Sequence, residues 1–273
     1  MTTIESPARG AGAITPGRGP RVIGKTVRGA WAAWVVAVVL GAAGWQLLSM
    51  QSGGWVPSVP ELVDAFGAVL TDPALFDNMR VTLVRVLWIL AGSIALGMLV
   101  GVVAGFSWRI RAFVRPILVM ALAIPDLVYI ILAILILGVG GSSGIIAVII
   151  AVTPLVTNVV LGSVLERDTR LDEMAKTYRL GPVDYGRHVL LRQIQPALIA
   201  ALKTAFAFSW KLVVLMEAIT APDGIGAQIM VEFKYLRAAE MIAYAVIFTV
   251  LMKVVEIAIL SVLQRNQRHY TRK

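Results

Sequence analysis

Six runs of apolar residues, each close to the length that crosses a lipid bilayer, dominate this chain of 273 residues. A transmembrane helix needs about 20 such residues. Hydrophobic residues make up 58% of the chain and charged residues 15%, more apolar surface than a soluble domain of this size can bury. The sequence therefore predicts an all-α polytopic membrane protein with six transmembrane helices. The runs lie near Trp31–Met50, Val81–Phe106, Val114–Leu137, Ile145–Leu161, Ala197–Ile219 and Met241–Leu263.

Basic residues alternate between the loops and indicate the topology. They precede the first run, follow the second and the sixth, and recur within 166–192, whereas 51–78 holds four acidic residues and no Lys or Arg. Because cytoplasmic loops carry the excess of Lys and Arg, we expect both termini and 166–192 in the cytoplasm. The net charge of +9 follows from this loop pattern, so no nucleic-acid binding is expected.

The same pattern divides the chain into parts. Residues 1–28 are rich in Gly, Pro, Thr and Arg and are predicted to form a disordered cytoplasmic tail. Residues 29–56 hold a retained first transmembrane helix and the start of an external loop, because the apolar run is longer than the core of a signal peptide. The other five helices occupy 57–264, and 265–273 form a basic cytoplasmic tail.

Residue types that carry catalysis or bind metals are scarce. The chain has no cysteine, and its only histidines are His188 and His269. The phosphate-binding pattern GxxxxGK[ST] is absent. The sequence therefore predicts no catalytic residue, no metal site and no cofactor of its own, and any ATP hydrolysis belongs to another chain.

The largest polar segment between apolar runs, 166–192, has the pattern of a short helix. Its apolar residues recur at helical spacing: Leu171, Met174, Tyr178 and Leu180. We expect Pro182 and Gly186 to break this helix, so that it lies across the membrane surface and docks one face onto a soluble partner. The alternative is that its Arg and Lys residues only hold the loop near anionic lipid.

Several motifs follow one another between Trp55 and Arg265. They are WVPSVPELV at 55–63, TLVRVL at 82–87, AIPDLVYIILAILILGVG at 123–140, PLVTNVVLG at 154–162, DGIGAQI at 223–229 and the acidic Glu256. Each motif alone is weak evidence, but in this order they resemble the permease subunit of an ATP-binding-cassette importer. Within that family the chain is most similar to the nitrate, sulfonate and taurine branch.

The resemblance implies a type I importer permease fold with a cytoplasmic coupling helix in a bacterial inner membrane. Two cytoplasmic ATPase subunits would bind ATP and Mg, and a second permease copy or a paralogous permease would complete the pathway. An external solute-binding protein would deliver a small anionic or polar solute. The resemblance leaves open which solute is carried.

The resemblance also implies which residues contact the ATPase. The family's coupling loop begins Glu-Ala-Ala, continues to a glycine and then to a Leu-Pro pair. This chain retains the opening but has Arg179 at the glycine position and Leu191-Arg192 at the Leu-Pro position. These departures leave open whether the loop couples in the usual way or the chain pairs with a more conventional permease. The implied contact residues are Glu173, Met174, Ala175, Tyr178, Arg179, Gly181 and Tyr185.

Charges within apolar runs are costly in lipid and usually face protein or water. Asp126 follows Pro125 in the third run, and Lys211 lies in the fifth run at a similar depth. These residues either form a buried ion pair or line the pathway.

Other residues in the runs are assigned structural roles. Lys253 and Glu256 are expected to pair on one helix, and Arg85 and Lys203, nearer the span ends, to extend to the interface. Small residues at four-residue spacing predict close helix packing: Gly92, Gly97, Gly101 and Gly105.

Two other functional classes remain as alternatives. A self-sufficient secondary transporter or channel would need no ATPase, but the chain shows no internal inverted repeat. An intramembrane enzyme would need clustered catalytic groups, and the sequence offers none.

Overall fold

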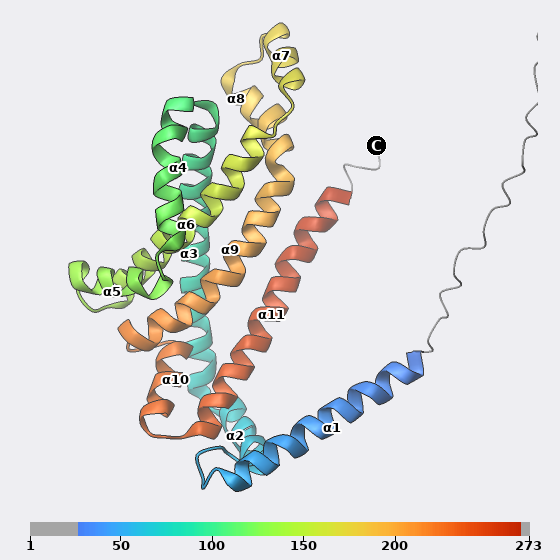
Figure 1. Ribbon diagram of the computed structural model, residues 1–273, viewed down its shortest axis with the longest axis vertical. Coiled ribbons are helices and arrows are strands. Elements are labelled where there is room, and N and C mark those ends of the chain that lie inside the picture. The colour runs from blue at the N-terminus through green and yellow to red at the C-terminus, as the bar shows by residue number, and fades with distance from the viewer. Residues whose placement is uncertain (1–26, 269–273) are drawn as a thin grey trace, which may run out of the picture. The chain divides into compact units, whose positions relative to one another are not determined.

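The computed structural model describes residues 27–268, and those residues are helical throughout apart from connecting turns (Figure 1). The predicted disordered tail lies outside the described residues up to residue 26, as do residues 269–273 of the basic tail. The elements are α1 (Val27–Gln51), α2 (Val59–Thr71), α3 (Pro73–Phe106), α4 (Trp108–Ala123), α5 (Asp126–Leu137), α6 (Gly141–Leu165), α7 (Thr169–Thr177), α8 (Pro182–Tyr185), the π-helical turn η1 (Gly186–Leu190), α9 (Leu191–Thr220), α10 (Ile225–Lys234) and α11 (Ala238–Arg268).

The chain divides into two compact units, residues 1–48 and 49–273. Within the first unit the structure describes most of α1, an apolar helix whose described side chains are largely exposed. The second unit holds all the other helices, and α11 continues as a helix into the predicted basic tail as far as Arg268. The sites described below all lie in the second unit.

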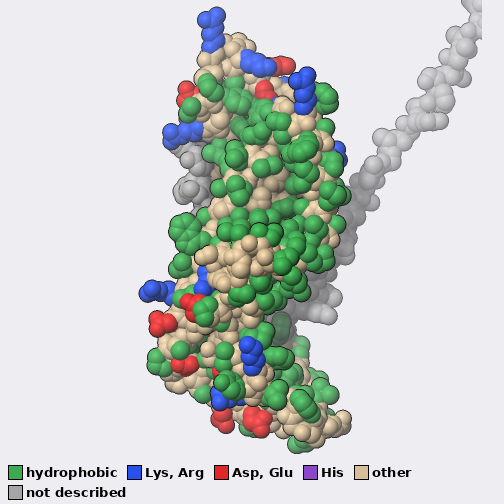
Figure 2. All heavy atoms as spheres, turned by 90° about the vertical axis from the view of Figure 1, so that its left-hand side faces the viewer, with side chains coloured by type: hydrophobic (Ala, Val, Ile, Leu, Met, Phe, Trp, Pro, Cys, Tyr) green, Lys and Arg blue, Asp and Glu red, His purple; other side chains and the backbone are tan. Residues whose placement is uncertain are grey.

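Five helices of the described chain are long and apolar enough to cross a membrane: α1, α3, α6, α9 with the turns before it, and α11. The pair α4 and α5 passes the same test together and gives a sixth span if the bent pair is counted as one. On the face shown in Figure 2, apolar side chains cover the middle, and charged side chains gather toward the two ends. The predicted all-α membrane fold is confirmed.

The third apolar run is not one straight helix. Helix α4 ends at Ala123, and α5 begins at Asp126 after a bend of 99°. Pro125 disfavours helical backbone at the residue before it, and Ile124 is extended, with φ −71° and ψ 128°. Pro125 therefore breaks the run Val114–Leu137 into two helices, and α5 turns sideways from the end of α4 (Figure 1).

The fifth span begins earlier than predicted. Pro182 occupies the first turn of α8, where the missing N–H needs no partner, and helical backbone then continues through η1 to Thr220. Gly186 has φ −57° and ψ −46°, values of a right-handed helix. The predicted break at Gly186 is therefore wrong. Residues Gly186–Leu190 form a π-helical turn, which joins α8 to α9 without ending the helix.

The α2–α3 corner is fixed by side chains that cap helix ends. Ser58 and Glu61 form a reciprocal capping box at the start of α2. Asp72 caps α3 through a 2.9 Å bond from the backbone N–H of Ala74. The other oxygen of Asp72 accepts a 2.8 Å hydrogen bond from Tyr244, which ties the start of α3 to α11.

The α3–α6 interface forms the centre of the second unit. Glycines of α3 lie directly against valines of α6: Gly97 on Val156, Gly101 on Val160 and Gly105 on Val164. A glycine on every fourth residue removes the side chains that would hold the two helices apart. The packing role predicted for these glycines and for Gly92, which lies against Ile149, is confirmed.

Replacing Gly101 by leucine is expected to force α3 and α6 apart. A Cβ atom there would lie 2.9 Å from Cβ of Val160 and 3.1 Å from the carbonyl oxygen of Thr157. Overpacking of this kind costs about 1–3 kcal/mol or more. The thermal unfolding midpoint of the detergent-purified protein should fall by several degrees. Gly162→Leu is the control because no atom lies within 4 Å of its Cβ position, and an equal loss in both variants would contradict this packing.

Candidate functional site

Helix α7 projects beyond the end of α6, at what we call the α7 end of the second unit (Figure 1). Asp168 starts this helix by accepting a 2.9 Å bond from the N–H of Arg170. Its C-terminus closes at Arg179, which has a left-handed φ of 51°. The next N–H, of Leu180, bonds back to the carbonyl of Ala175 at 2.9 Å. The predicted short helix is therefore present, with defined caps at both ends.

A small polar cluster fixes α7 to its surroundings. Nε of Arg167 lies 2.9 Å from a carboxylate oxygen of Asp172, and the other oxygen accepts a 2.7 Å bond from the hydroxyl of Tyr185. The guanidinium of Arg167 also donates to the carbonyl of Val164 and lies 4.5 Å from the ring centre of Phe106. Helices α3, α6, α7 and α8 therefore meet at Arg167. Sequence analysis did not single out Arg167 or Asp172, whose spacing resembles an ordinary surface ion pair.

The predicted contact residues divide between the two sides of this segment. Ala175 is buried and Tyr185 is half-buried, so these two hold the segment together. Met174 and Tyr178 are 44% and 74% exposed. Glu173, Arg179 and Gly181 are also exposed. With Leu171 and Val183, both uncovered, Met174 and Tyr178 give α7 and α8 an apolar surface edged by charge.

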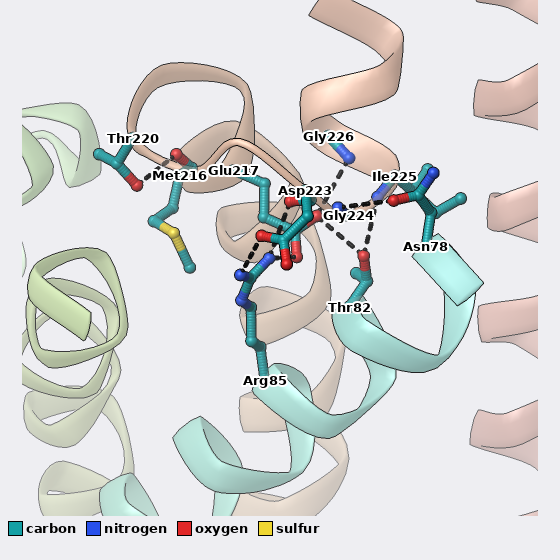
Figure 3. A network of polar contacts seen from close by, with 10 residues as sticks. All are labelled: Asn78, Thr82, Arg85, Met216, Glu217, Thr220, Asp223, Gly224, Ile225 and Gly226. Carbon is teal, nitrogen blue, oxygen red and sulfur yellow. Dashed lines mark hydrogen bonds and ion pairs between the residues drawn. The ribbon is translucent and has the colours of Figure 1, made fainter. Parts of the chain in front are cut away.

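A second polar cluster, drawn in Figure 3, lies at the other end of the unit, the α10 end. The side chain of Glu217, in α9, is fully buried. One of its oxygens lies 2.8 Å from Nη1 of Arg85, in α3. Nη2 of Arg85 lies 2.6 Å from the carboxylate of Asp223, in the turn between α9 and α10. One guanidinium therefore bridges a buried and a half-exposed carboxylate.

Backbone groups complete this cluster. The second oxygen of Glu217 accepts bonds from the hydroxyl of Thr82 at 2.8 Å and from the N–H of Gly226 at 3.0 Å. The hydroxyl of Thr82 in turn accepts a 2.9 Å bond from the N–H of Ile225. The N–H of Gly224 donates to the amide oxygen of Asn78 at 2.9 Å. The start of α10 is thus bonded to two successive turns of α3.

The expectation that Arg85 extends to the membrane interface is wrong. Its partners lie 132 and 138 residues further along the chain, so no local pattern indicates them. Glu217 itself offered a signal that was missed. A carboxylate within the apolar run of α9 must find a cation, because a lone charge there is costly.

Asp126 and Lys211 do not form the predicted ion pair. Neither residue takes part in any ion pair within the part of the chain that the structure describes, and both are exposed. The bend at Pro125 places Asp126 at the start of α5, where it lines a cavity of about 360 Å³. The ammonium of Lys211 lies 5.8 Å from the ring of Trp210. The predicted pair of Lys253 with Glu256 is confirmed at 2.8 Å.

Residues 93–273 match the family described as binding-protein-dependent transport system inner membrane component. The chain belongs to this family. Its fold resembles that of a chain in the MetNI methionine ABC transporter, solved in inward-facing conformations. The TM-score is 0.59 at 20% identity, over 70% of this permease and 96% of that chain. The predicted importer-permease fold is therefore confirmed.

Curated relatives indicate the branch to which this permease belongs. It is 26% identical over 231 residues to the putative aliphatic sulfonates transport permease protein SsuC of Bacillus subtilis, covering 82% of this chain and 83% of the relative. It is 22% identical to the taurine transport system permease protein TauC of Escherichia coli, covering 71% and 70%. The nitrate import permease protein NrtB of Leptolyngbya laminosa is 25% identical, covering 75% and 76%. The branch predicted from the motifs is confirmed.

Replacing Arg85 alone by methionine is expected to destabilise the permease more than replacing Arg85 and Glu217 together. Arg85→Met leaves the buried Glu217 carboxylate without its cation, a change that typically costs about 3–5 kcal/mol. Adding Glu217→Gln should recover a large part of that loss, which the thermal unfolding midpoints of the single and double variants will show. Lys203→Met is the control, because that lysine is exposed and lies in no ion pair among the side chains that the structure describes. Equal midpoints for wild type and Arg85→Met would contradict a structural role.

Proposed function

We propose that this permease forms half of the translocation pathway of an ATP-driven importer and contacts an ATPase subunit through α7. The observation that carries this proposal is the uncovered apolar surface of α7 and α8 around Met174 and Tyr178. It is held in place by the Arg167 cluster, so the surface is pre-formed. A short amphipathic helix presented in this way suits a groove on a soluble partner.

The proposed orientation places the α7 end in the cytoplasm and the α10 end outside. The first turns of α4 support it, because they carry Arg109, Arg111 and Arg115 at the α7 end of the unit. In this orientation both chain termini are cytoplasmic.

The proposed assembly contains two ATPase subunits, which bind ATP and Mg, and two permeases. The second permease is another copy of this chain or a paralogous one. Membership of a binding-protein-dependent family supports an external solute-binding protein at the α10 end. The described residues contain no group of three or more His, Cys, Asp or Glu side chains placed to hold a metal ion. The sequence also lacks the phosphate-binding pattern GxxxxGK[ST], so ATP hydrolysis is assigned to the ATPase subunits.

The proposed cargo is a small polar or anionic solute. The names of the relatives support this class, since they are assigned to aliphatic sulfonates, taurine and nitrate. A self-sufficient transporter or channel is the alternative, and it differs in needing no stoichiometric ATPase chain.

Replacing both Met174 and Tyr178 by aspartate is expected to release the ATPase. The changes place two charges on the apolar surface of α7, where an interface would desolvate them. ATPase co-purification with the tagged permease should fall at least about tenfold, which corresponds to about 1.4 kcal/mol. Phe233→Asp is the matched control, because Phe233 is 57% exposed at the α10 end. Full ATPase recovery with the double variant would refute docking through α7.

Cysteines at Ser142 and Arg187 are expected to react from opposite sides of the membrane. The chain has no natural cysteine, and both positions are exposed, at the start of α6 and in η1. In intact cells an impermeant thiol reagent should label the cysteine at 142. The same reagent should label the cysteine at 187 only after the cells are opened. Labelling of both cysteines from outside would contradict the proposed orientation.

A further inference from the structure

We propose that the cavity at the α4–α5 break binds the ammonium group of a small amine-bearing solute through Asp126. This proposal rests on the proposed function, since it assigns a chemical class to the cargo of the same pathway. A solute that also bears a sulfonate or carboxylate group satisfies both assignments as a zwitterion.

No cation pairs with Asp126 among the side chains that the structure describes. In contrast, the carboxylates of Glu217 in α9 and Glu256 in α11 each lie 2.8 Å from a cation. Asp126 follows the 16-residue α4, which is about 24 Å long, so it lies within the length of a hydrocarbon core about 30 Å thick. A carboxylate at that depth requires either water or a cation from outside the chain.

The cavity has the size and lining of a small-solute site. Its volume is about 360 Å³, and small-molecule pockets occupy about 300–1,000 Å³. Asp126 is the one charged residue of its lining. The other walls come from α4, α6 and α9, and include Leu122, Leu155, Phe208 and Leu212. Apolar side chains around one carboxylate suit a ligand with an alkyl body and one cationic end.

The lining favours an organic ammonium over a metal ion. A hard cation such as Ca²⁺ takes 6–8 oxygen ligands, and this cavity offers a single carboxylate among apolar side chains. A primary ammonium can be bound by one charge-assisted bond while its alkyl chain contacts apolar walls. Phe208 is 45% exposed in the wall, and an aromatic face adds attraction for an ammonium group. Asp126 and the wall together therefore match ammonium chemistry.

Cysteine labelling tests the electrostatic preference of the cavity directly. Because the chain has no natural cysteine, Leu155→Cys places one reactive thiol in the wall. Full-length protein in membrane fragments open on both sides is treated with a cationic trimethylammonium-ethyl or an anionic sulfonatoethyl methanethiosulfonate. Each reagent's rate is divided by its rate with a free thiol in solution. With Asp126 present, this corrected rate should be about tenfold higher for the cationic reagent than for the anionic one. With Asp126→Asn the ratio of the two corrected rates, cationic to anionic, should fall toward one.

A matched control and a competitor complete the test. Ser142→Cys lies beyond the far end of α5, so its reagent ratio should not change with Asp126→Asn. Ethylammonium chloride should slow the reaction of the cationic reagent with the Leu155→Cys thiol when Asp126 is present, and sodium ethanesulfonate at the same ionic strength should not. The proposal is overturned if that thiol reacts with neither reagent, if Asp126→Asn leaves the ratio unchanged, or if both salts protect equally. These readouts need no ATPase, so they are separate from the co-purification test of importer function.

Discussion

The buried charge of Glu217 determines how the α10 end of this permease is built. A carboxylate enclosed by apolar helices is stable only if its oxygens are bonded, and here they receive Arg85, Thr82 and the N–H of Gly226. Two of these partners lie on α3, and the third begins α10. Glycine is required at 226, because a Cβ there would collide with the backbone of Val214. The charge therefore sets the close approach of α10 to α9 and its attachment to α3.

Helix α3 connects this cluster to the opposite end of the unit. It carries Thr82 and Arg85 near one end and Phe106 at the other, where Phe106 meets Arg167 beside α7. The 21 residues from Arg85 to Phe106 span about 32 Å of helix. Between these points the glycines of α3 lock it against α6, so the segment is supported along its length. One stiff helix thus joins the two polar clusters of the permease.

The features predicted from sequence are those with a local physical cause. The length of each apolar run indicated a transmembrane helix. Glycine spacing indicated the α3–α6 contact, and the three-residue spacing of Lys253 and Glu256 indicated their pair. Depth along a helix, in contrast, says nothing about which way a side chain points. Asp126 and Lys211 were matched by depth alone, and the structure shows no ion pair between them. The sequence pattern also did not predict the 99° bend just before Asp126. The pairing of Arg85 with Glu217 depends on contacts across 132 residues, which no single-sequence pattern contains.

The departures from the family pattern at Arg179 and Arg192 change the surface of residues 166–192 and leave their backbone conformation in place. Arg179 has φ 51°, a left-handed conformation that glycine adopts freely and that costs other residues about 1–2 kcal/mol. The turn that follows α7 is thus formed despite the missing glycine, and the substitution adds an exposed cation beside Tyr178. Arg192, at the position of a family proline, lies in the second position of α9, within the continuous helical stretch from Pro182 to Thr220. A proline there would remove an N–H and hinder that continuity, whereas arginine retains the donor. Arg179 therefore preserves the turn that ends α7, and Arg192 preserves the helix that becomes α9. Both add positive charge to the segment proposed to meet the ATPase.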